Sequence, residues 1–254
     1  MNLFNIIINL LKNNIMSTQN NKKIKVHDLG LVDYKFGLNY QKGLINRIKK
    51  DENHLIFLEH NKTITVGTKG TVADILFTTK QLENDGFSII KTDRGGQVTI
   101  HNKGQLVVYP LVQLKEFELK PVDYVRRIEI MIVDFLKEIG IDSKIIIGKT
   151  GVWIDSFNKQ RKIVAIGVRV SGGITMHGFA LNIDNDLGDF NSIIPCGLPE
   201  SEATSLKREL KSDIDKSDIK SKLINSFEKI FDCEVIVGWY RINALSFRVH
   251  ILWW

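Results

Sequence analysis

The segment Lys162-Ile-Val-Ala-Ile-Gly-Val-Arg-Val170 is followed, after a short turn, by a second β-rich run at Ile174–Ile183. Alternate residues of the first segment are apolar, which is typical of a strand that turns one face toward a core. Two runs that lie only a turn apart favour an antiparallel meander over a βαβ crossover, because a crossover needs a dozen or more connecting residues. The pair therefore predicts neighbouring antiparallel strands in one sheet.

Helical patterns accompany further β-rich runs along the chain. Residues 121–139 have apolar residues at helical spacing, begin with Pro121 and stop at Gly140, a favoured start and a common end for a helix. Residues 218–231 follow Ser217, which we expect to be the N-cap. The other predicted elements are a helix over 33–50 and strands over Leu55–Glu59, Thr63–Gly67, Phe87–Lys91, Gln97–His101, Gln105–Val112 and Gly151–Asp155. The sequence predicts an α/β domain of the α+β type, with mixed, largely antiparallel sheets packed against helices.

The composition excludes several classes of protein. The chain has 254 residues, 43% of them hydrophobic and 25% charged, as expected of one or two globular domains. Two cysteines exclude a disulfide scaffold and a multi-cysteine zinc site. No apolar run reaches the roughly 18 residues of a membrane-spanning helix. The formal net charge is only +6, and the basic residues are spread along the chain, so neither a membrane nor a nucleic acid is an expected partner.

The two ends of the chain differ from its middle. Residues 1–23 are predicted to be a leader, because residues 1–27 contain lysines and no acidic residue. Three interpretations stay open: a mitochondrial transit peptide, a disordered leader, or a true start at Met16. The last residues, 241–254, end in an apolar stretch whose structure the sequence does not decide.

Nucleotide and metal motifs are absent from the sequence or lack their context. Gly148-Lys149-Thr150 resembles the end of a phosphate-binding P-loop, but position 143 is Ser143 and the intervening residues are the β-branched run Ile145–Ile147. Such residues resist the backbone conformations of a phosphate nest. No G-x-G-x-x-G follows a strand, and the histidines form no i, i+4 pair. We therefore expect no cofactor and no metal.

The stretch Arg94-Gly-Gly-Gln-Val-Thr-Ile-His101 is the most unusual in the chain. A glycine pair between an arginine and a strand allows the backbone to approach a ligand closely. Arg94 can anchor an anion or orient a loop, and His101 can bond a substrate carbonyl at the end of a strand. The alternative is a tight turn followed by a structural histidine.

Three further stretches carry candidate chemistry. Pro195-Cys196-Gly197 places a thiol in a loop with free backbone amides, a context that suits a reactive thiolate, whereas Cys233 fits a buried structural thiol. Lys162 is either a solvated strand end or a cation that lowers the pKa of Cys196. The small residues of His177-Gly-Phe-Ala-Leu-Asn182 either leave room for an acyl chain beside Phe179 or mark a bend in a buried strand.

Taken in order, these four stretches resemble the octanoyltransferases of lipoate biosynthesis, the lipoyl(octanoyl) transferase family. Leu58-Glu-His60 and Thr204-Ser205-Leu206 fit the same family, and the resemblance covers about residues 24–240. It implies a biotin/lipoate protein ligase-like fold with one catalytic domain over 24–240. The chain departs from the family at Ile100, where an aromatic residue is usual, and at Asn102-Lys103-Gly104, where Gly-Pro-Gly is usual.

The resemblance implies transfer of an octanoyl group from acyl carrier protein to a lysine of a lipoyl domain. Such domains belong to 2-oxoacid dehydrogenase complexes and to the glycine cleavage H protein. Cys196 would carry the acyl group as a thioester, and Lys162 would activate the thiol and shuttle a proton. The acyl group would bind along Arg94, Gly95, Gly96, Gln97, Val98, Thr99, Ile100, His101, Ala165, Ile166, Gly167, Gly178, Phe179 and Ala180. The compartment would be mitochondrial in a eukaryote and cytoplasmic in a bacterium.

Two alternatives stay open at this point. An ATP-dependent lipoate-protein or biotin-protein ligase would share the fold, and Lys162 would suit an acyl-adenylate, although adenylation needs no thiol. A non-catalytic acyl-carrier-binding protein would keep the fold without turnover. The presence of both Cys196 and Lys162 favours the transferase.

Overall fold

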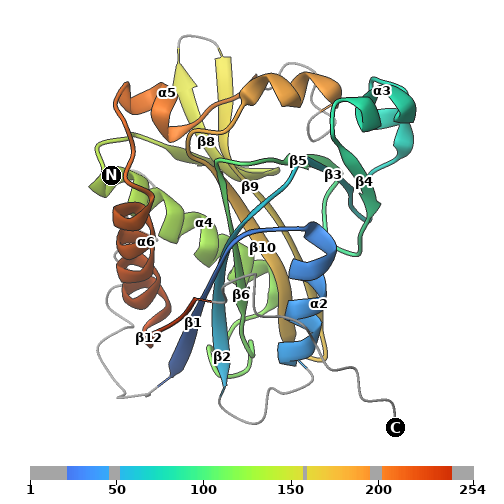
Figure 1. Ribbon diagram of the computed structural model, residues 1–254. Helices are drawn as coiled ribbons and strands as arrows, with labels where there is room; N and C mark the ends of the chain where they lie inside the picture. Colours follow the sequence, from blue (N-terminus) through green and yellow to red (C-terminus); the bar gives the residue numbers. More distant parts are fainter. Residues whose placement is uncertain (1–21, 46–51, 157–158, 195–201, 242–254) are drawn as a thin grey trace, which may run out of the picture.

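The computed structural model describes residues 22–45, 52–156, 159–194 and 202–241, which form two sheets with helices on both faces of the larger one (Figure 1). The larger sheet has the order β12-β1-β2-β6-β10-β9-β8-β7, with β11 paired to β9, and the smaller has the order β4-β3-β5. The strands are β1 (Lys23–Val32), β2 (Asn53–His60), β3 (Thr63–Val66), β4 (Ser88–Lys91), β5 (Val98–His101), β6 (Gln105–Leu111), β7 (Lys144–Ile146), β8 (Lys149–Ser156), β9 (Lys159–Ser171), β10 (Ile174–Asn182), β11 (Glu202–Ala203) and β12 (Glu234–Arg241).

The α-helices lie between these strands along the chain, together with two short 3-10 helices in the described ranges. They are α2 (Tyr34–Ile45), α3 (Thr79–Asn84), α4 (Pro121–Glu138), α5 (Leu206–Leu210) and α6 (Lys216–Phe231), with 3-10 turns η1 (Val72–Asp74) and η2 (Leu187–Ser192). None of the helices in the described ranges is long and apolar enough to cross a membrane. Most of the predicted leader and C-terminal tail lies outside the described residues.

The pairing of β9 with β10 confirms the predicted meander. β10 is antiparallel to both β9 and β6, and β9 is antiparallel to β8. The edge of the same sheet differs from the prediction, because β1 pairs in parallel with β2 and with β12. Helix α2 makes the crossover between β1 and β2, so a βαβ unit precedes the meanders. The sheet is therefore mixed, as predicted, with a parallel edge that the sequence analysis missed.

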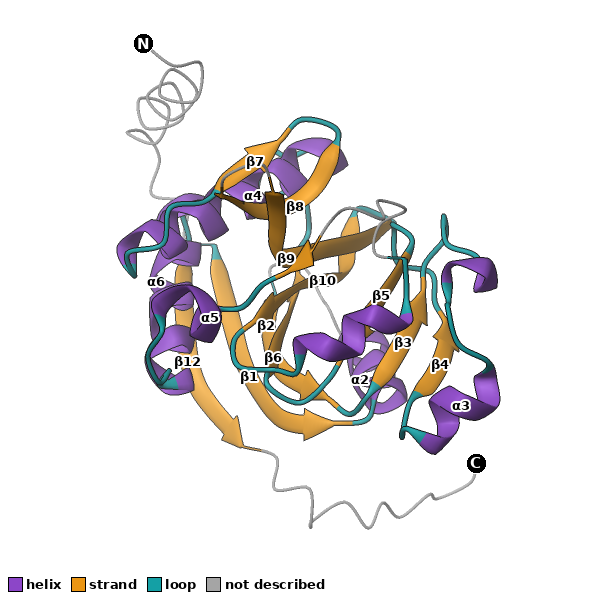
Figure 2. Ribbon diagram, turned by 90° about the horizontal axis from the view of Figure 1, so that it is seen from above, coloured by secondary structure: helices purple, strands orange, loops and turns teal. Residues whose placement is uncertain are grey.

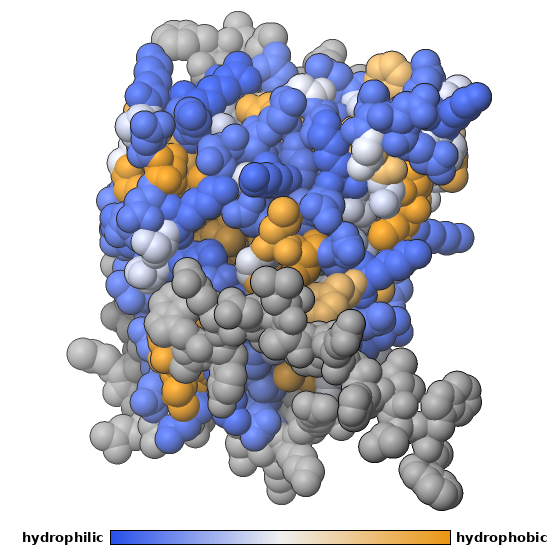
Figure 3. Space-filling model, in the orientation of Figure 1, coloured by the Kyte–Doolittle hydropathy of each residue, from blue (hydrophilic) through white to orange (hydrophobic). Residues whose placement is uncertain are grey.

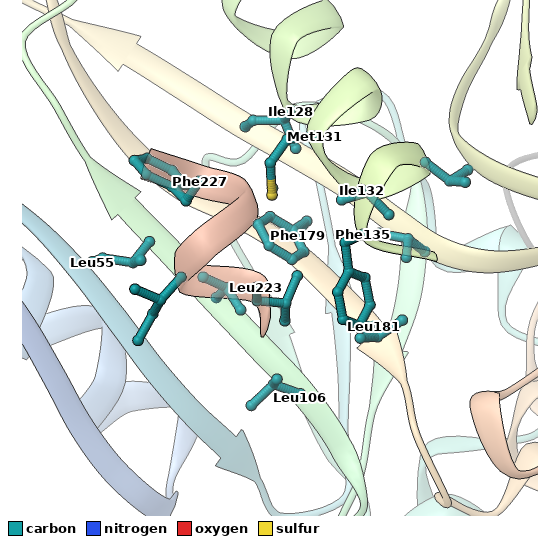
Figure 4. Packing of buried hydrophobic residues seen from close by; sticks show 14 of the residues in the cluster. Leu55, Leu106, Ile128, Met131, Ile132, Phe135, Phe179, Leu181, Leu223 and Phe227 are labelled. Atoms are coloured by element: carbon teal, nitrogen blue, oxygen red, sulfur yellow. The ribbon is translucent and has the colours of Figure 1, made fainter. Parts of the chain in front are cut away.

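Helices α4 and α6 cover one face of the larger sheet, and α2 covers the other face (Figures 1 and 2). Phe179 and Leu181 of β10 belong to the main core together with residues of α4 and α6, and Figure 4 shows this packing around Met131. On the opposite face, Tyr40 and other residues of α2 pack against alternate residues of β2 and β6. Burial of each large side chain contributes about 1.5–3 kcal/mol, so this layering holds the sheet rigidly between its helices.

The helix ends follow local signals with one correction. Pro121 opens α4, and Gly140, at φ +82°, follows its end, as the sequence predicts. Helix α6 begins earlier than predicted, at Lys216, and its N-cap is Asp215, which accepts a hydrogen bond from the amide of Ser217. Ser217 is therefore not the cap. A carboxylate is as good an N-cap acceptor as a hydroxyl and also interacts favourably with the helix dipole.

Candidate active site

A cavity of about 530 Å³ lies on the side of the larger sheet that α2 covers. Strand alternation explains where it forms, because successive side chains point to opposite faces. In β10, Phe179 and Leu181 pack in the main core, and Gly178 and Ala180 line the cavity, which Phe179 also borders. On the neighbouring strand, Ala165 pairs with Ala180. Small residues on one face of two adjacent strands leave the space that the cavity occupies.

The loop after Arg94 crosses this face of the sheet at close range. The amide of Gly95 donates to the carbonyl of Val168 at 3.0 Å. A Cβ atom at Gly167 would lie 2.8 Å from the Gly95 carbonyl oxygen, and Gly96 has φ +90°. The glycines therefore allow backbone-to-backbone contact here, where the sequence analysis expected a close approach to a ligand.

Arg94 holds this loop in place. Its side chain is buried, and its guanidinium donates to the hydroxyl and carbonyl of Thr65 and to the carbonyls of Gly95 and Gln97, at 2.6–3.1 Å. Of the two roles that the sequence left open, these bonds favour loop orientation. The arginine also contributes a positive charge beside the cavity, which adds to the larger effect of burial in lowering the pKa values of His101 and His177.

Two buried histidines form a neutral, polar part of the cavity wall. His101 donates from Nδ1 to Oε1 of Gln105 at 2.8 Å, and His177 donates from Nε2 to Asp93 at 2.7 Å. Burial is the main cause that lowers both pKa values, that of His177 to about 4. Tyr34 stacks on His101, and Tyr109 contacts His177 edge-on. At neutral pH these groups offer hydrogen bonds without a net charge.

Lys162 lines the cavity near the start of β9, away from the two histidines in the sequence of the wall residues. Its Nζ donates to the carbonyl of Thr150 at 3.2 Å and lies 4.4 Å from the ring centroid of Trp153. Lys162 and Gly167 both line the cavity, and at about 3.3 Å per residue of strand they are about 17 Å apart. The cavity therefore runs along β9, with an ammonium group near one end.

Cys196 lies outside the described residues, but the chain is placed on both sides of its segment. Before it, the amide of Ile194 donates to the carbonyl of Asp74 at 2.8 Å. After it, Ala203 of β11 pairs with Lys162, and the amide of Thr204 donates to the Lys162 carbonyl at 2.9 Å. The segment that carries the predicted nucleophile thus rejoins the described structure at the predicted catalytic lysine.

Cys233 has the character predicted for a structural thiol. It packs against the main core, and burial raises its pKa to about 12. A thiol with so high a pKa is almost entirely protonated at neutral pH and is a poor nucleophile.

The cavity brings together most of the residues predicted to bind the acyl group. Gly95 and Ile100 are not on its wall. Ile100 packs in a separate core with Ile64 and Phe87, because alternate residues of β5 face opposite sides. The predicted residues on the wall are Arg94, Gly96, Gln97, Val98, Thr99, His101, Lys162, Ala165, Ile166, Gly167, Gly178, Phe179 and Ala180.

Sequence reasoning missed a second group of wall residues, which come from five other parts of the chain. Gly148-Lys149-Thr150, which the sequence analysis set aside as a P-loop, spans the end of the turn before β8 and the first two residues of β8, and it borders the cavity. His177 also belongs to a stretch that the sequence analysis had singled out. The missed residues are Tyr34, Lys69, Val107, Tyr109, Ile147, Gly148, Lys149, Thr150, Trp153 and His177.

A cavity beside a lysine, on a mixed sheet covered by helices, is the candidate active site of this domain. Residues 33–228 match the family described as the lipoyl protein ligase A/B catalytic domain. The chain belongs to this family. Over 231 residues it is 39% identical to the octanoyltransferase of Flavobacterium johnsoniae, covering 85% of this chain and 100% of that protein. It is 36% identical over 226 residues to the octanoyltransferase of Mycobacterium leprae, covering 88% and 92%.

Solved structures share the fold at low sequence identity. A structure of an archaeal lipoylation system, a bipartite lipoate protein ligase and its E2 lipoyl domain from Thermoplasma acidophilum, aligns with a TM-score of 0.70 at 14% identity, over 85% of this chain and 87% of that one. Lipoate-protein ligase A bound with ATP aligns with a TM-score of 0.66 at 13% identity, over 86% and 90%. The predicted lipoate-ligase-like fold is confirmed.

Proposed function

We propose that this protein is an octanoyltransferase that moves an octanoyl group from acyl carrier protein to a lysine side chain of a lipoyl domain. The bacterial relatives at 36–40% identity are named octanoyltransferases. The observation that carries the proposal is the cavity along β9, with Lys162 on its wall and the chain that follows Cys196 hydrogen-bonded to Lys162. A thiol, a cation and an elongated acyl pocket are the parts that transfer between thioester and amine requires.

The acyl chain would lie along the face made by Ala165 and Gly167 on β9 and by Gly178 and Ala180 on β10. Methyl groups and glycines present an apolar surface without filling it. This part of the cavity wall is rigid, because the intervening side chains, Ile166 on β9 and Phe179 on β10, pack against or in the main core. A rigid, narrow pocket selects an acyl chain by length, since a chain that is too long cannot be accommodated by repacking.

The chemistry is written as two acyl transfers. The Cys196 thiolate attacks the carbonyl carbon of the carrier thioester, a new carbon–sulfur bond forms, and the carrier thiolate leaves and takes a proton. The lysine amine of the lipoyl domain then attacks the Cys196 thioester, an amide bond forms, and the Cys196 thiolate is regenerated as the amine loses its proton. Lys162 would favour the thiolate by its charge and exchange these protons.

The partners follow from this reaction. The donor is acyl carrier protein, and the acceptors are lipoyl domains of 2-oxoacid dehydrogenase complexes and the glycine cleavage H protein. A net charge of +6 supports steering toward acidic protein domains. Apart from the residues in grey, the face shown in Figure 3 is mostly hydrophilic, with apolar side chains in separate patches. The compartment would be the cytoplasm of a bacterium or the mitochondrion of a eukaryote.

A turnover assay separates this function from its alternatives. Octanoyl-carrier and an unmodified lipoyl domain are mixed with the protein without ATP, and octanoylated lipoyl domain is measured by mass spectrometry. The proposal predicts catalytic turnover under these conditions. Turnover that needs ATP and free octanoate, with release of pyrophosphate, would identify a ligase instead. Tight carrier binding without any product would identify a non-catalytic binding protein.

A further inference from the structure

Glu129 is a buried carboxylate beneath the cavity end that holds Lys162. It lies on α4 with 3% of its side chain exposed. Its Oε1 accepts a hydrogen bond from the amide of Gly151 at 2.9 Å, and its Oε2 pairs with Arg126 at 2.7 Å. A buried carboxylate needs such partners, because its removal from water costs substantial free energy unless it is paired.

The amide that Glu129 binds belongs to the backbone that surrounds Lys162. Gly151 has φ +120°, and a Cβ atom there would lie 2.5 Å from the Val164 carbonyl oxygen and 3.6 Å from Lys162 Nζ. The preceding residue, Thr150, supplies the carbonyl that accepts from Lys162 Nζ. Glu129 therefore anchors the short piece of β8 that holds the ammonium group.

Electrostatics connects the two side chains as well. Burial raises the pKa of Glu129, while the Gly151 hydrogen bond and the positive charges of Arg126 and Lys162 act to lower it. The charge of Lys162 therefore affects the pKa of Glu129, and both side chains contact the Thr150–Gly151 backbone. Burial and pairing of this kind are typical of side chains that support a functional site.

We propose that Glu129 is a positioning residue for Lys162: it anchors Thr150 and Gly151 so that the Thr150 carbonyl holds the lysine ammonium at the cavity. The inference rests on the proposed function, in which Lys162 exchanges protons during acyl transfer. Loss of the anchor would let this part of β8 shift, and a displacement of about 1 Å in a catalytic group can reduce the rate by up to about a hundredfold.

The primary experiment compares three variants of α4. Glu129→Met removes the acceptor at similar size, Glu129→Gln keeps an acceptor for the Gly151 amide, and Asp134→Leu is the matched control, because Asp134 pairs with Lys229 of α6 away from the cavity. Acyl transfer from octanoyl-carrier gives kcat and KM for each. We expect Glu129→Met to lower kcat by about tenfold or more with little change in KM, and Glu129→Gln to restore most of it.

Two results would overturn the inference: a Glu129→Met variant as active as Asp134→Leu, or a Glu129→Gln variant no better than Glu129→Met. A double-mutant cycle with Lys162→Ala adds a direct test of coupling. In that background Glu129→Met should slow the reaction no further, whereas an undiminished effect would show that Glu129 acts elsewhere. If Lys162→Ala alone keeps the wild-type rate, the proposed role of Lys162 fails. If Lys162→Ala has a reduced rate while Glu129→Met keeps the wild-type rate, the role of Lys162 stands and only the inference about Glu129 fails.

A titration keeps the inference testable if Glu129→Met does not fold. The carboxyl carbon of Glu129 is followed by carbon-13 NMR in the wild-type protein and in Lys162→Met. Because the Lys162 charge lowers the pKa of Glu129, we expect a higher pKa in the variant. An unchanged pKa of Glu129 would contradict the electrostatic coupling of Glu129 to Lys162.

Discussion

The amide of Thr204 donates a 2.9 Å hydrogen bond to the carbonyl oxygen of Lys162, and the adjacent Ala203 pairs with Lys162 in parallel register. Thr204 is itself fully buried, and its carbonyl accepts from Asn182. This contact fixes the chain that follows the Pro195-Cys196-Gly197 stretch beside the candidate lysine. Under the proposed function, Cys196 and Lys162 would act as parts of one site.

The cavity wall predicts a change in acyl preference. Ala165→Leu adds bulk on the face of β9 that lines the cavity, so we expect kcat/KM to fall for octanoyl-carrier and to fall much less for butanoyl-carrier. The ratio of the two values is measured with purified carriers. Val170→Leu, on the same strand but packed against the main core, is the control and should leave the ratio unchanged. An unaltered ratio in Ala165→Leu would place the acyl chain elsewhere.

The close approach of β10 to β6 predicts a stability effect at Gly178. A Cβ atom there would lie 2.1 Å from the Val108 carbonyl oxygen, so Gly178→Ala forces the strands apart. We expect the free energy of unfolding, measured in urea, to fall by about 1–3 kcal/mol. Gly43→Ala, in helix α2 with no atom near its Cβ position, should instead be neutral or stabilising by about 0.5–1 kcal/mol. Equal effects of the two variants would contradict the packing described.

The buried histidines predict loss of stability in mild acid. His60 donates from Nδ1 to the Val32 carbonyl, contacts the Tyr109 hydroxyl through Nε2, and has a pKa lowered by burial from 6.5 to about 4. Between these values the unfolded chain binds a proton that the folded chain does not, so stability falls as pH decreases from 6.5 toward 4. Each such group contributes a slope of up to about 1.4 kcal/mol per pH unit.

Urea unfolding at several pH values measures this slope. His60→Gln removes the titrating group, so its slope between pH 6.5 and 4 should be smaller than that of the wild-type protein by about one proton. The contribution of the carboxylates, which titrate in the lower part of the same pH range, is common to both proteins and drops out of the difference between the two slopes. Equal slopes in the two proteins would show that His60 is not held neutral by burial.

Local patterns in the sequence were sufficient to predict the centre of the fold. The turn before β10 and the Pro121 start of α4 depend on neighbouring residues, and both are confirmed. The alternation in β9 holds from Val164 to Val170 but not at Ile163, which lies in the main core next to Val164 beside a register shift between β8 and β9. The parallel edge was not predicted, because the pairing of β1 with β12 joins opposite ends of the chain. No local pattern specifies such a partner.

The candidate site shows the same division. Most predicted wall residues line the cavity because they lie on the strands that the sequence identified. Ile100 was included as part of a continuous run, although the two-residue period of a strand turns it into a separate core. Trp153 and Tyr34 come from elements whose position beside the cavity depends on tertiary packing. Glu129 is one of many charged helix residues until the structure shows it buried against Gly151.

The most direct test of the account is the intact mass of the protein after mixing with octanoyl-carrier. The wild-type protein and Cys233→Ser should each gain one octanoyl group as a thioester, because Cys233 is a partly buried thiol with a raised pKa. Cys196→Ser should gain none. An octanoyl thioester that forms on the Cys196→Ser variant at the wild-type rate would contradict the assignment of Cys196 as the nucleophile.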